Sequence, residues 1–167
     1  MLKSPYLEDS RRLADVIAAI QALGTYKFYK LDFQGWSDRI SGDKESANHW
    51  KAVFHEHPEF FRLDGTRLKA SLVVRRQHRR LYNVDEAREF TREEYEQLSS
   101  AEKANRVSRS PLSSAEIATL INTALELHSR ALENEQASRW WIPIVTAAVA
   151  ALASLAGAFI GATLGGA

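Results

Sequence analysis

A long uncharged stretch near the C-terminus constrains this chain more than any other feature of its sequence. From Trp140 to Leu164 no charged residue occurs, and the last charge before the stretch is Arg139. About 25 residues at 1.5 Å per residue form roughly 37 Å of helix, which exceeds a hydrocarbon layer of about 30 Å. We therefore expect a single transmembrane helix over residues 140–164 and a short tail over 165–167. The alternative is a buried helix of a soluble domain, since the Ala and Gly content lowers the hydrophobicity.

The residues at the start of this stretch suit a membrane interface. Trp140 and Trp141 carry the amphipathic rings that gather at the headgroup level, and Arg139 lies just before them. The first residues lack the apolar core of a signal peptide. These features predict a single-pass, tail-anchored membrane protein whose N-terminal domain is cytoplasmic and whose span contacts membrane lipid.

Small residues recur at every fourth position inside the stretch. They are Ala153, Gly157, Gly161 and Gly165. Such spacing lets two helix backbones approach closely in lipid, which is a known route to association. The sequence therefore predicts a homo-oligomer formed through this ridge, and the alternative is an Ala- and Gly-rich span that carries no such information.

The charges divide the rest of the chain into two parts. Residues 1–84 contain 15 Lys and Arg against 10 Asp and Glu, a net charge of +5, whereas residues 85–139 contain 7 against 11, a net charge of −4. The hydrophobic fraction of 45% and the charged fraction of 26% are those of a folded protein. We expect a basic head over 1–84 and an acidic helical connector, or stalk, over 85–139.

Periodicity within the head predicts three helices and a β-hairpin. The first helix begins at Asp9 or Ser10 and ends at Gly24, and a short strand follows within 25–31. The next two helices cover 33–40 and 43–57. Two strands, 59–63 and 67–75, are joined by the turn Asp64-Gly65. The fold class is therefore α+β and mostly α.

The run from His57 to Gly65, placed after a Trp-containing third helix, resembles part of a winged-helix domain. The likeness covers residues 9–84 and rests on the order helix, strand, helix, helix, hairpin. It implies that 43–57 is the recognition-type helix and that Asp64-Gly65 is the tip of the wing. Winged helices bind nucleic acid or other proteins, so the fold alone does not choose between them.

Basic side chains are concentrated on and after the expected hairpin. As a candidate patch for nucleic acid or anionic lipid they are Arg62, Arg67, Lys69, Arg75, Arg76, Arg79 and Arg80. The alternative is a solvated strand end that is basic only for solubility.

The connector contains two capping-box patterns. One opens a helix at residues 91–104, and the other, Ser113 with Glu116, opens a long helix that runs towards the uncharged stretch. Apolar residues from Ile117 to Leu132 form a broad arc on this helix. The arc must pack on the preceding helix, on the head, or on another copy of itself.

No catalytic pattern is recognisable in the sequence, and we expect neither an enzyme nor a bound cofactor. His49, His55 and His57 lack the i, i+4 spacing of a helical zinc pair, so no metal site is expected. The leading hypothesis is a membrane-tethered interaction or sensing module that binds an unidentified protein partner and self-associates. The alternatives are a tethered nucleic-acid-binding protein and a membrane-perturbing effector.

Overall fold

The computed structural model describes residues 4–138, 143–151, 153 and 154. The fold is α+β and mostly helical, as the sequence predicts. The chain divides into two compact units, Met1–His128 and Ser129–Ala167, which are described separately.

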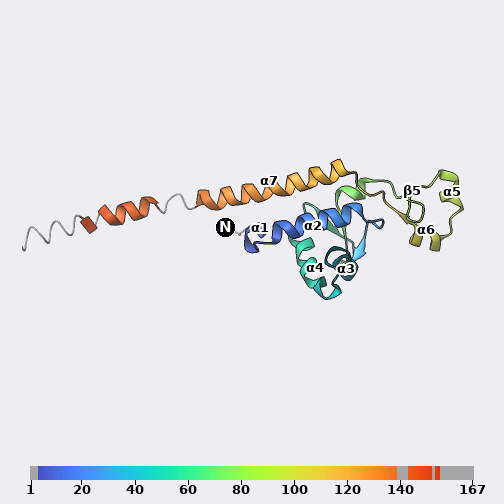
Figure 1. The fold of residues 1–167 in the computed structure, drawn as a ribbon, viewed down its shortest axis with the longest axis horizontal. Coiled ribbons are helices and arrows are strands. Elements are labelled where there is room, and N and C mark those ends of the chain that lie inside the picture. Colours follow the sequence, from blue (N-terminus) through green and yellow to red (C-terminus); the bar gives the residue numbers. More distant parts are fainter. Residues whose placement is uncertain (1–3, 139–142, 152, 155–167) are drawn as a thin grey trace, which may run out of the picture. The chain divides into compact units, whose positions relative to one another are not determined.

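Two helices open the first unit. The short α1 covers Pro5–Glu8 and α2 covers Arg12–Thr25 (Figure 1). The start of α2 lies after the predicted Asp9 or Ser10, because the Asp9 carboxylate accepts a hydrogen bond from the Arg11 N–H and forms a turn before the helix. One face of α2 is fully buried in the core, as its helical spacing predicts; its members include Val16, Ala19, Ile20 and Leu23.

The next helices also follow the predicted pattern. Helix α3 spans Phe33–Ser41 and ends at Gly42, whose φ of 71° is the left-handed conformation that glycine adopts without strain. The third predicted helix is in two parts, a 3₁₀ turn η1 at Lys44–Ser46 and α4 at Ala47–Glu56. Asp43 caps the 3₁₀ turn by accepting from the Glu45 N–H.

A three-stranded antiparallel sheet closes this part of the unit. Its strands are β1 at Leu31–Asp32, β2 at Phe61–Leu63 and β3 at Lys69–Leu72, in the order β1-β3-β2. The strand predicted within 25–31 is wrong for all but its last residue, because the chain leaves α2 in an irregular connection. The strand predicted to reach Arg75 ends at Leu72, and a 3₁₀ turn η2 follows at Val74–Gln77.

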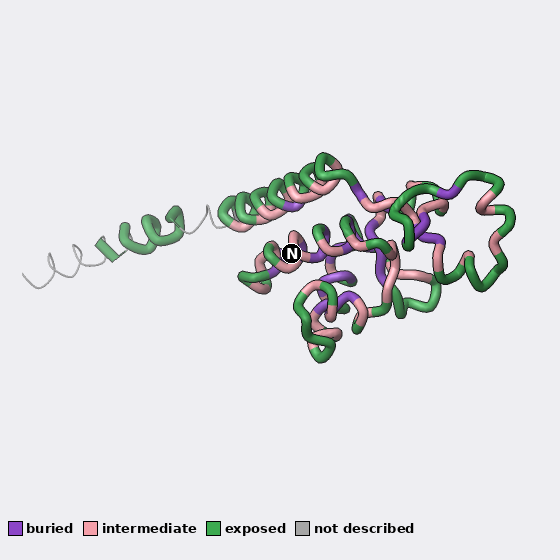
Figure 2. The backbone as a smooth tube through the Cα atoms, turned by 45° about the vertical axis from the view of Figure 1, so that its right-hand side comes forward, coloured by how far each residue is buried: buried purple, intermediate pink, exposed green. Residues whose placement is uncertain are grey.

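The hydrophobic core lies where α2, α3 and α4 meet this sheet. Trp36, Phe54 and Phe61 are among its largest fully buried side chains, and the Trp36 Nε1–H donates to the Ala70 carbonyl at 2.9 Å. Figure 2 shows buried residues, in purple, running through this region, whereas the segment that carries α5 and α6 is mainly exposed. The core therefore fixes α4 and the β2–β3 hairpin relative to each other.

The region after the hairpin contains a second small sheet that the sequence does not predict. Its strands are β4 at Tyr82–Asn83, β5 at Arg88–Glu89 and β6 at Val107–Ser108, in the order β5-β4-β6. The helix predicted at 91–104 is two helices, α5 at Arg92–Gln97 and α6 at Ser100–Arg106, and each begins with a complete capping box. Two short helices form because Leu98 and Ser99 are extended between them.

Helix α7, Ser114–Ser138, begins as predicted. The Ser113 hydroxyl accepts from the Glu116 N–H, and the Glu116 carboxylate accepts from the Ser113 N–H. Within the first unit the apolar arc of α7 packs against the core of the head. Of the three predicted packing surfaces, the head is therefore the correct one for this part of the arc. The residues in contact with the core are Ile117, Leu120, Ile121, Ala124 and Leu127. Residue 84, the predicted end of the head, therefore lies inside the first compact unit.

The described residues of the second unit are helical: the last part of α7, then 143–151, 153 and 154. Among these and the other described residues, no helix has the length and apolar character needed to cross a membrane. Most of the predicted span lies outside the described residues, namely 140–142, 152 and 155–164. The same holds for the interface residues Arg139, Trp140 and Trp141, and for three members of the small-residue ridge, Gly157, Gly161 and Gly165; the fourth, Ala153, is helical and exposed.

Candidate anion-binding groove

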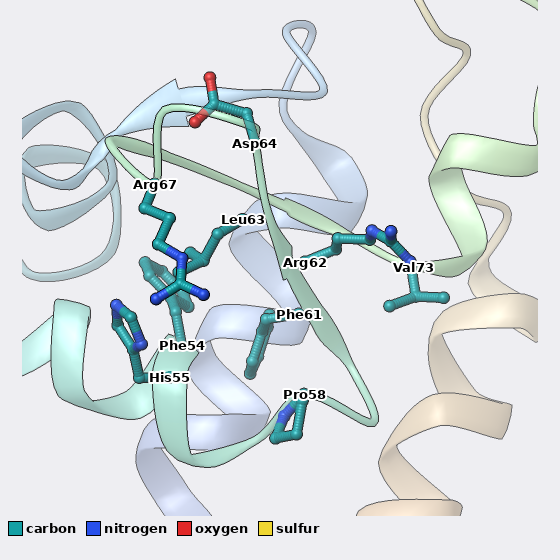
Figure 3. Close-up of a pocket in the computed structure, with 9 residues that line it drawn as sticks. All are labelled: Phe54, His55, Pro58, Phe61, Arg62, Leu63, Asp64, Arg67 and Val73. Carbon is teal, nitrogen blue, oxygen red and sulfur yellow. The ribbon is translucent and has the colours of Figure 1, made fainter.

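A groove of about 480 Å³ lies between the C-terminal end of α4 and the β2–β3 hairpin (Figure 3). Helix α4 and the residue after its C-cap supply one side, and the hairpin supplies the other. The lining residues are Phe54, His55, Pro58, Phe61, Arg62, Leu63, Asp64, Arg67 and Val73.

The strand alternation of β2 separates apolar from basic side chains. Phe61 and Leu63 lie on one face of the strand, and Arg62 between them points the other way, towards Val73 (Figure 3). From the hairpin turn, Arg67 reaches across to His55 and Phe54 of α4 (Figure 3). The groove therefore has an apolar floor and a basic side chain towards each end.

The two arginines of the groove have no acidic partner in the described part of the chain. Arg62 and Arg67 are exposed, and within the described residues no carboxylate lies at ion-pair distance from either guanidinium. Arg67 also has a φ of 57°, a conformation that costs free energy for a residue with a Cβ. These two cations are available to an anion from outside the chain.

The acidic residue in the lining is committed to the hairpin itself. Asp64 accepts from the Thr66 hydroxyl at 2.8 Å and from the N–H groups of Leu68 and Lys69, and it lies 3.7 Å from the Lys30 ammonium. The Thr66 hydrogen bond is the largest cause that lowers the pKa of Asp64, so the carboxylate stays ionised and holds the turn. It does not neutralise Arg67.

The outward face of α4 is polar and weakly basic. Lys44 of η1 and Asn48, Lys51 and His55 follow one another at helical spacing, and all are exposed. Glu56 is turned away from this face and pairs with the largely buried Arg12 at 3.0 Å. The acidic character that Glu56 gives the helix in sequence is therefore absent from this surface.

The remaining members of the predicted basic patch divide into exposed and buried residues. Lys69, Arg76, Arg79 and Arg80 are exposed, and Arg80 makes a long hydrogen bond to the Lys103 carbonyl at 3.4 Å. Their role as a surface for nucleic acid or lipid stays a prediction.

Arg75 is a correction to that patch, because its side chain is fully buried. Its guanidinium donates hydrogen bonds of 2.8–3.3 Å to four backbone carbonyls, those of Leu23, Lys27, Arg109 and Ser110. Burial lowers the pKa of Arg75 to about 10, which still leaves it charged at neutral pH. Arg75 joins the end of α2 to the segment before α7 and is not accessible to a ligand.

Part of the acidic charge of the connector is paired with arginines of the same segment. Arg106 lies 2.7 Å from Asp85, and Arg88 lies 2.7 Å from Glu86 and from Glu94. The hydrogen bond from Arg88 is the largest cause that lowers the pKa of Glu94 to about 2. Asp85, Glu86 and Glu94 of the connector therefore have arginine partners, whereas Arg62 and Arg67 of the head have no carboxylate at ion-pair distance among the described residues.

A second polar cluster, which no sequence pattern predicts, lies beside α1. The buried His57 is 2.9 Å from the Glu59 carboxylate through Nδ1, and the Tyr6 ring packs on His57 with centroids 4.5 Å apart. Burial, followed by the charge of Glu59, raises the pKa of Tyr6. His57 Nε2 and His128 Nδ1 are buried without a hydrogen-bond partner among the described residues. No local motif predicts this cluster, because its members come from distant parts of the chain.

The described residues contain no group of three His, Cys, Asp or Glu side chains placed to hold a metal ion. His49 pairs with Asp15 at 3.0 Å, and His57 pairs with Glu59. These two histidines therefore have local partners, whereas His55 lines the groove.

Comparison of the chain with models of protein families, with curated proteins and with solved structures gives no match. The functional conclusion therefore depends on the geometry of the groove and its surroundings.

Proposed function

We propose that this protein is a membrane-tethered interaction module rather than an enzyme. Its winged-helix-like head binds an acidic partner on the surface formed by α4 and the β2–β3 hairpin. The C-terminal stretch anchors the chain in a membrane, with the head on the cytoplasmic side, and brings copies together.

The order of elements supports the winged-helix likeness of the head. Helix α2, strand β1, helices α3 and α4 and the β2–β3 hairpin follow one another, and β3 lies between β1 and β2 in the sheet. In the proposed likeness, α4 is the recognition-type helix and the turn that carries Asp64, Gly65 and Arg67 is the tip of the wing. The likeness concerns the fold, so the function must come from the surface.

One observation carries the binding role: Arg62 and Arg67 lie on a concave, partly apolar surface, and no acidic partner for either lies among the described residues. Arg76 and Arg79 are also exposed without an ion pair among the described residues, but they do not line the groove, whereas Arg88 and Arg92 have carboxylates within 3 Å. A guanidinium offers a planar fork of donors that fits carboxylate and phosphate groups. Two of them beside an apolar floor provide both charge attraction and burial for a partner.

The anchoring and self-association are supported by sequence pattern. The uncharged length of residues 140–164 suits a span, and the spacing of Gly157 and Gly161 suits close helix packing. Replacing both glycines by Leu should reduce self-association in a membrane two-hybrid assay. Unchanged association would remove this part of the proposal.

The binding role can be tested by affinity purification of the full-length protein in mild detergent, followed by identification of bound protein, lipid and nucleic acid. The test variant combines Arg62→Gln with Arg67→Gln. The control is Arg92→Gln, which removes an exposed charge on α5 far along the chain. We expect a defined protein to be recovered with the wild type and the control and lost from the double variant. Equal recovery from all three forms would contradict the proposal.

A second candidate function is nucleic-acid binding, and the outward face of α4 favours it. Lys44, Asn48, Lys51 and His55 form an exposed stripe from which Glu56 is turned away. This function predicts that duplex DNA binds with an affinity that falls steeply with salt, and that Lys51→Gln makes the slope shallower by about one. Absence of duplex binding by the full-length protein at low salt would eliminate it.

A further inference from the structure

We propose that the groove receives an extended acidic peptide segment, which pairs with the free edge of β2 and places its carboxylates on Arg62 and Arg67. The inference rests on the proposed function and names the chemistry of the partner. It is carried by three features of the groove: an open strand edge, an apolar floor and two unpaired cations.

Strand β2 has one open edge. The sheet order β1-β3-β2 leaves β2 at the margin, and within the described residues no strand pairs with its other side. The backbone N–H and C=O groups of residues 60, 62 and 64 point towards β3. The Val73 N–H donates to the Phe60 carbonyl and the Asp64 N–H donates to the Lys69 carbonyl, both at 2.9 Å. The alternation therefore turns the backbone groups of Phe61 and Leu63 to the open side.

These open backbone groups favour a peptide. The Phe61 N–H already donates to the His57 carbonyl at 3.0 Å. The groups on this edge that remain for a ligand are the Phe61 carbonyl and the N–H and C=O of Leu63. Two of these three groups are acceptors and one is a donor. An extended peptide supplies N–H and C=O groups in alternation and can satisfy both kinds. A nucleic-acid phosphate has only acceptor oxygens and cannot satisfy the carbonyls.

The side chains around the edge define the sequence that fits. Pro58, Leu63 and Val73 keep apolar surface exposed in the groove, above the buried rings of Phe54 and Phe61. The groove volume of about 480 Å³ is within the size range of ligand pockets. Side chains of an extended peptide alternate between its two faces. A segment in which carboxylates alternate with Val, Leu or Phe therefore presents apolar groups to the floor and acidic groups to the arginines.

The probe that tests this inference is a fluorescein-labelled peptide, Glu-Val-Glu-Phe-Glu-Val-Glu, added to the full-length protein in detergent and followed by fluorescence anisotropy. The matched peptide control replaces every Glu by Gln. Two further peptides carry N-methyl groups, one on its apolar residues and the other on its acidic residues. Pairing with a strand edge uses the N–H groups of every second residue, so only one of the two methylated peptides should lose binding.

We expect saturable binding of the acidic peptide and about tenfold weaker binding of the Gln peptide, because charge-assisted hydrogen bonds to arginine are lost. Arg62→Gln and Arg67→Gln should each weaken binding by a similar factor, and Arg92→Gln should leave it unchanged. Equal affinity of the two N-methylated peptides, or no effect of either groove variant, would overturn the inference. Displacement of the peptide by an equimolar 20-base-pair duplex would also overturn it and assign the groove to nucleic acid.

The experiments distinguish failure of the acidic-peptide inference from failure of the proposed interaction module. If the wild type recovers a protein partner that depends on Arg62 and Arg67 but does not bind the acidic peptide, the peptide inference is wrong and the interaction module stands. If the groove variants change neither recovery nor peptide binding, both are wrong.

Discussion

Replacing Arg75 by Met should destabilise the first unit more than the loss of any exposed arginine. The guanidinium is fully buried and supplies the donors for four carbonyls that come from two distant parts of the chain. The Leu23 carbonyl is one of the last carbonyls of α2 and has no helical partner, so Arg75 caps that helix end. Met fills much of the volume but offers no donor.

The magnitude follows from two opposing effects. Removing the charge relieves its desolvation cost, but each buried carbonyl without a donor costs about 1–3 kcal/mol. Four carbonyls lose their donor, one in a buried hydrogen bond and three in partly buried ones, so the second effect dominates and the net loss should be about 3–5 kcal/mol. At about 3 °C per kcal/mol for a unit of this size, the midpoint of thermal unfolding should fall by roughly 10–15 °C.

Far-UV circular dichroism of the full-length protein in detergent measures this change. Arg79→Met, four residues later and exposed, is the matched control and should shift the free energy of unfolding by no more than about 0.5 kcal/mol. Arg75→Lys keeps the charge but loses the planar fork, so we expect an intermediate loss of stability. If Arg75→Met melts within about 2 °C of the wild type, the capping and bridging role assigned to Arg75 from these contacts is refuted.

Three further predictions follow from the head and the connector. Gly42→Ala should cost about 1 kcal/mol in thermal unfolding, because φ is 71° there, whereas Gly65→Ala, which has open space and no positive φ, should be nearly neutral; equal costs would contradict the backbone explanation. Trp36→Phe should cost about 2–4 kcal/mol in the same assay, because a buried hydrogen bond and ring volume are lost, and a loss below about 1 kcal/mol would show that the core relaxes around it. The Glu94 carboxyl should titrate by NMR near pH 2, well below its ordinary value of 4.5, so its contribution to α5 is present above pH 4.5 and is lost as the pH falls towards 2. Arg88→Gln should move that midpoint upwards, and an unchanged midpoint would exclude the Arg88 contact as the cause.

The elements that the sequence predicts well are those with strong local signals. Helix α3 ends where Gly42 allows a left-handed residue, and α7 begins where Ser113 and Glu116 form reciprocal hydrogen bonds. Both signals act within one turn of chain, so no tertiary contact can override them easily. The apolar periodicity of α2 is equally local and correctly predicts its buried face.

The second sheet could not be predicted because its strands are only two residues long. Tyr82–Asn83 and its partners show no alternation over the four or more residues that a strand pattern needs. Their pairing depends on the Val84 N–H bond to the Arg106 carbonyl and similar contacts between distant residues. The same limit applies to the cluster of Tyr6, His57 and His128, whose members meet only in the folded chain.

The candidate site was predicted in part. Arg62 and Arg67 are exposed on the hairpin, as a basic patch requires. In the sequence nothing about the residue type distinguishes Arg75 from the exposed Arg76, and Arg75 is buried because η2 turns its side chain inwards. The apolar run Leu72-Val73-Val74 directly before Arg75 is the available signal that this end of the strand continues into the interior. The groove itself needs α4 and the hairpin in contact, which no local pattern encodes.

The way in which α2 ends has a consequence for synthesis on the ribosome. The Leu23 carbonyl accepts its hydrogen bond from Arg75, which is 52 residues later in the chain. The Gly24 carbonyl accepts from the Leu112 N–H, still further along the chain. A nascent chain that has emerged only as far as the hairpin contains every strand of the first sheet but cannot close the end of its longest early helix. The head should therefore reach its final stability late, once the start of α7 is outside the exit tunnel, and a pause in translation before that point would expose an incomplete fold.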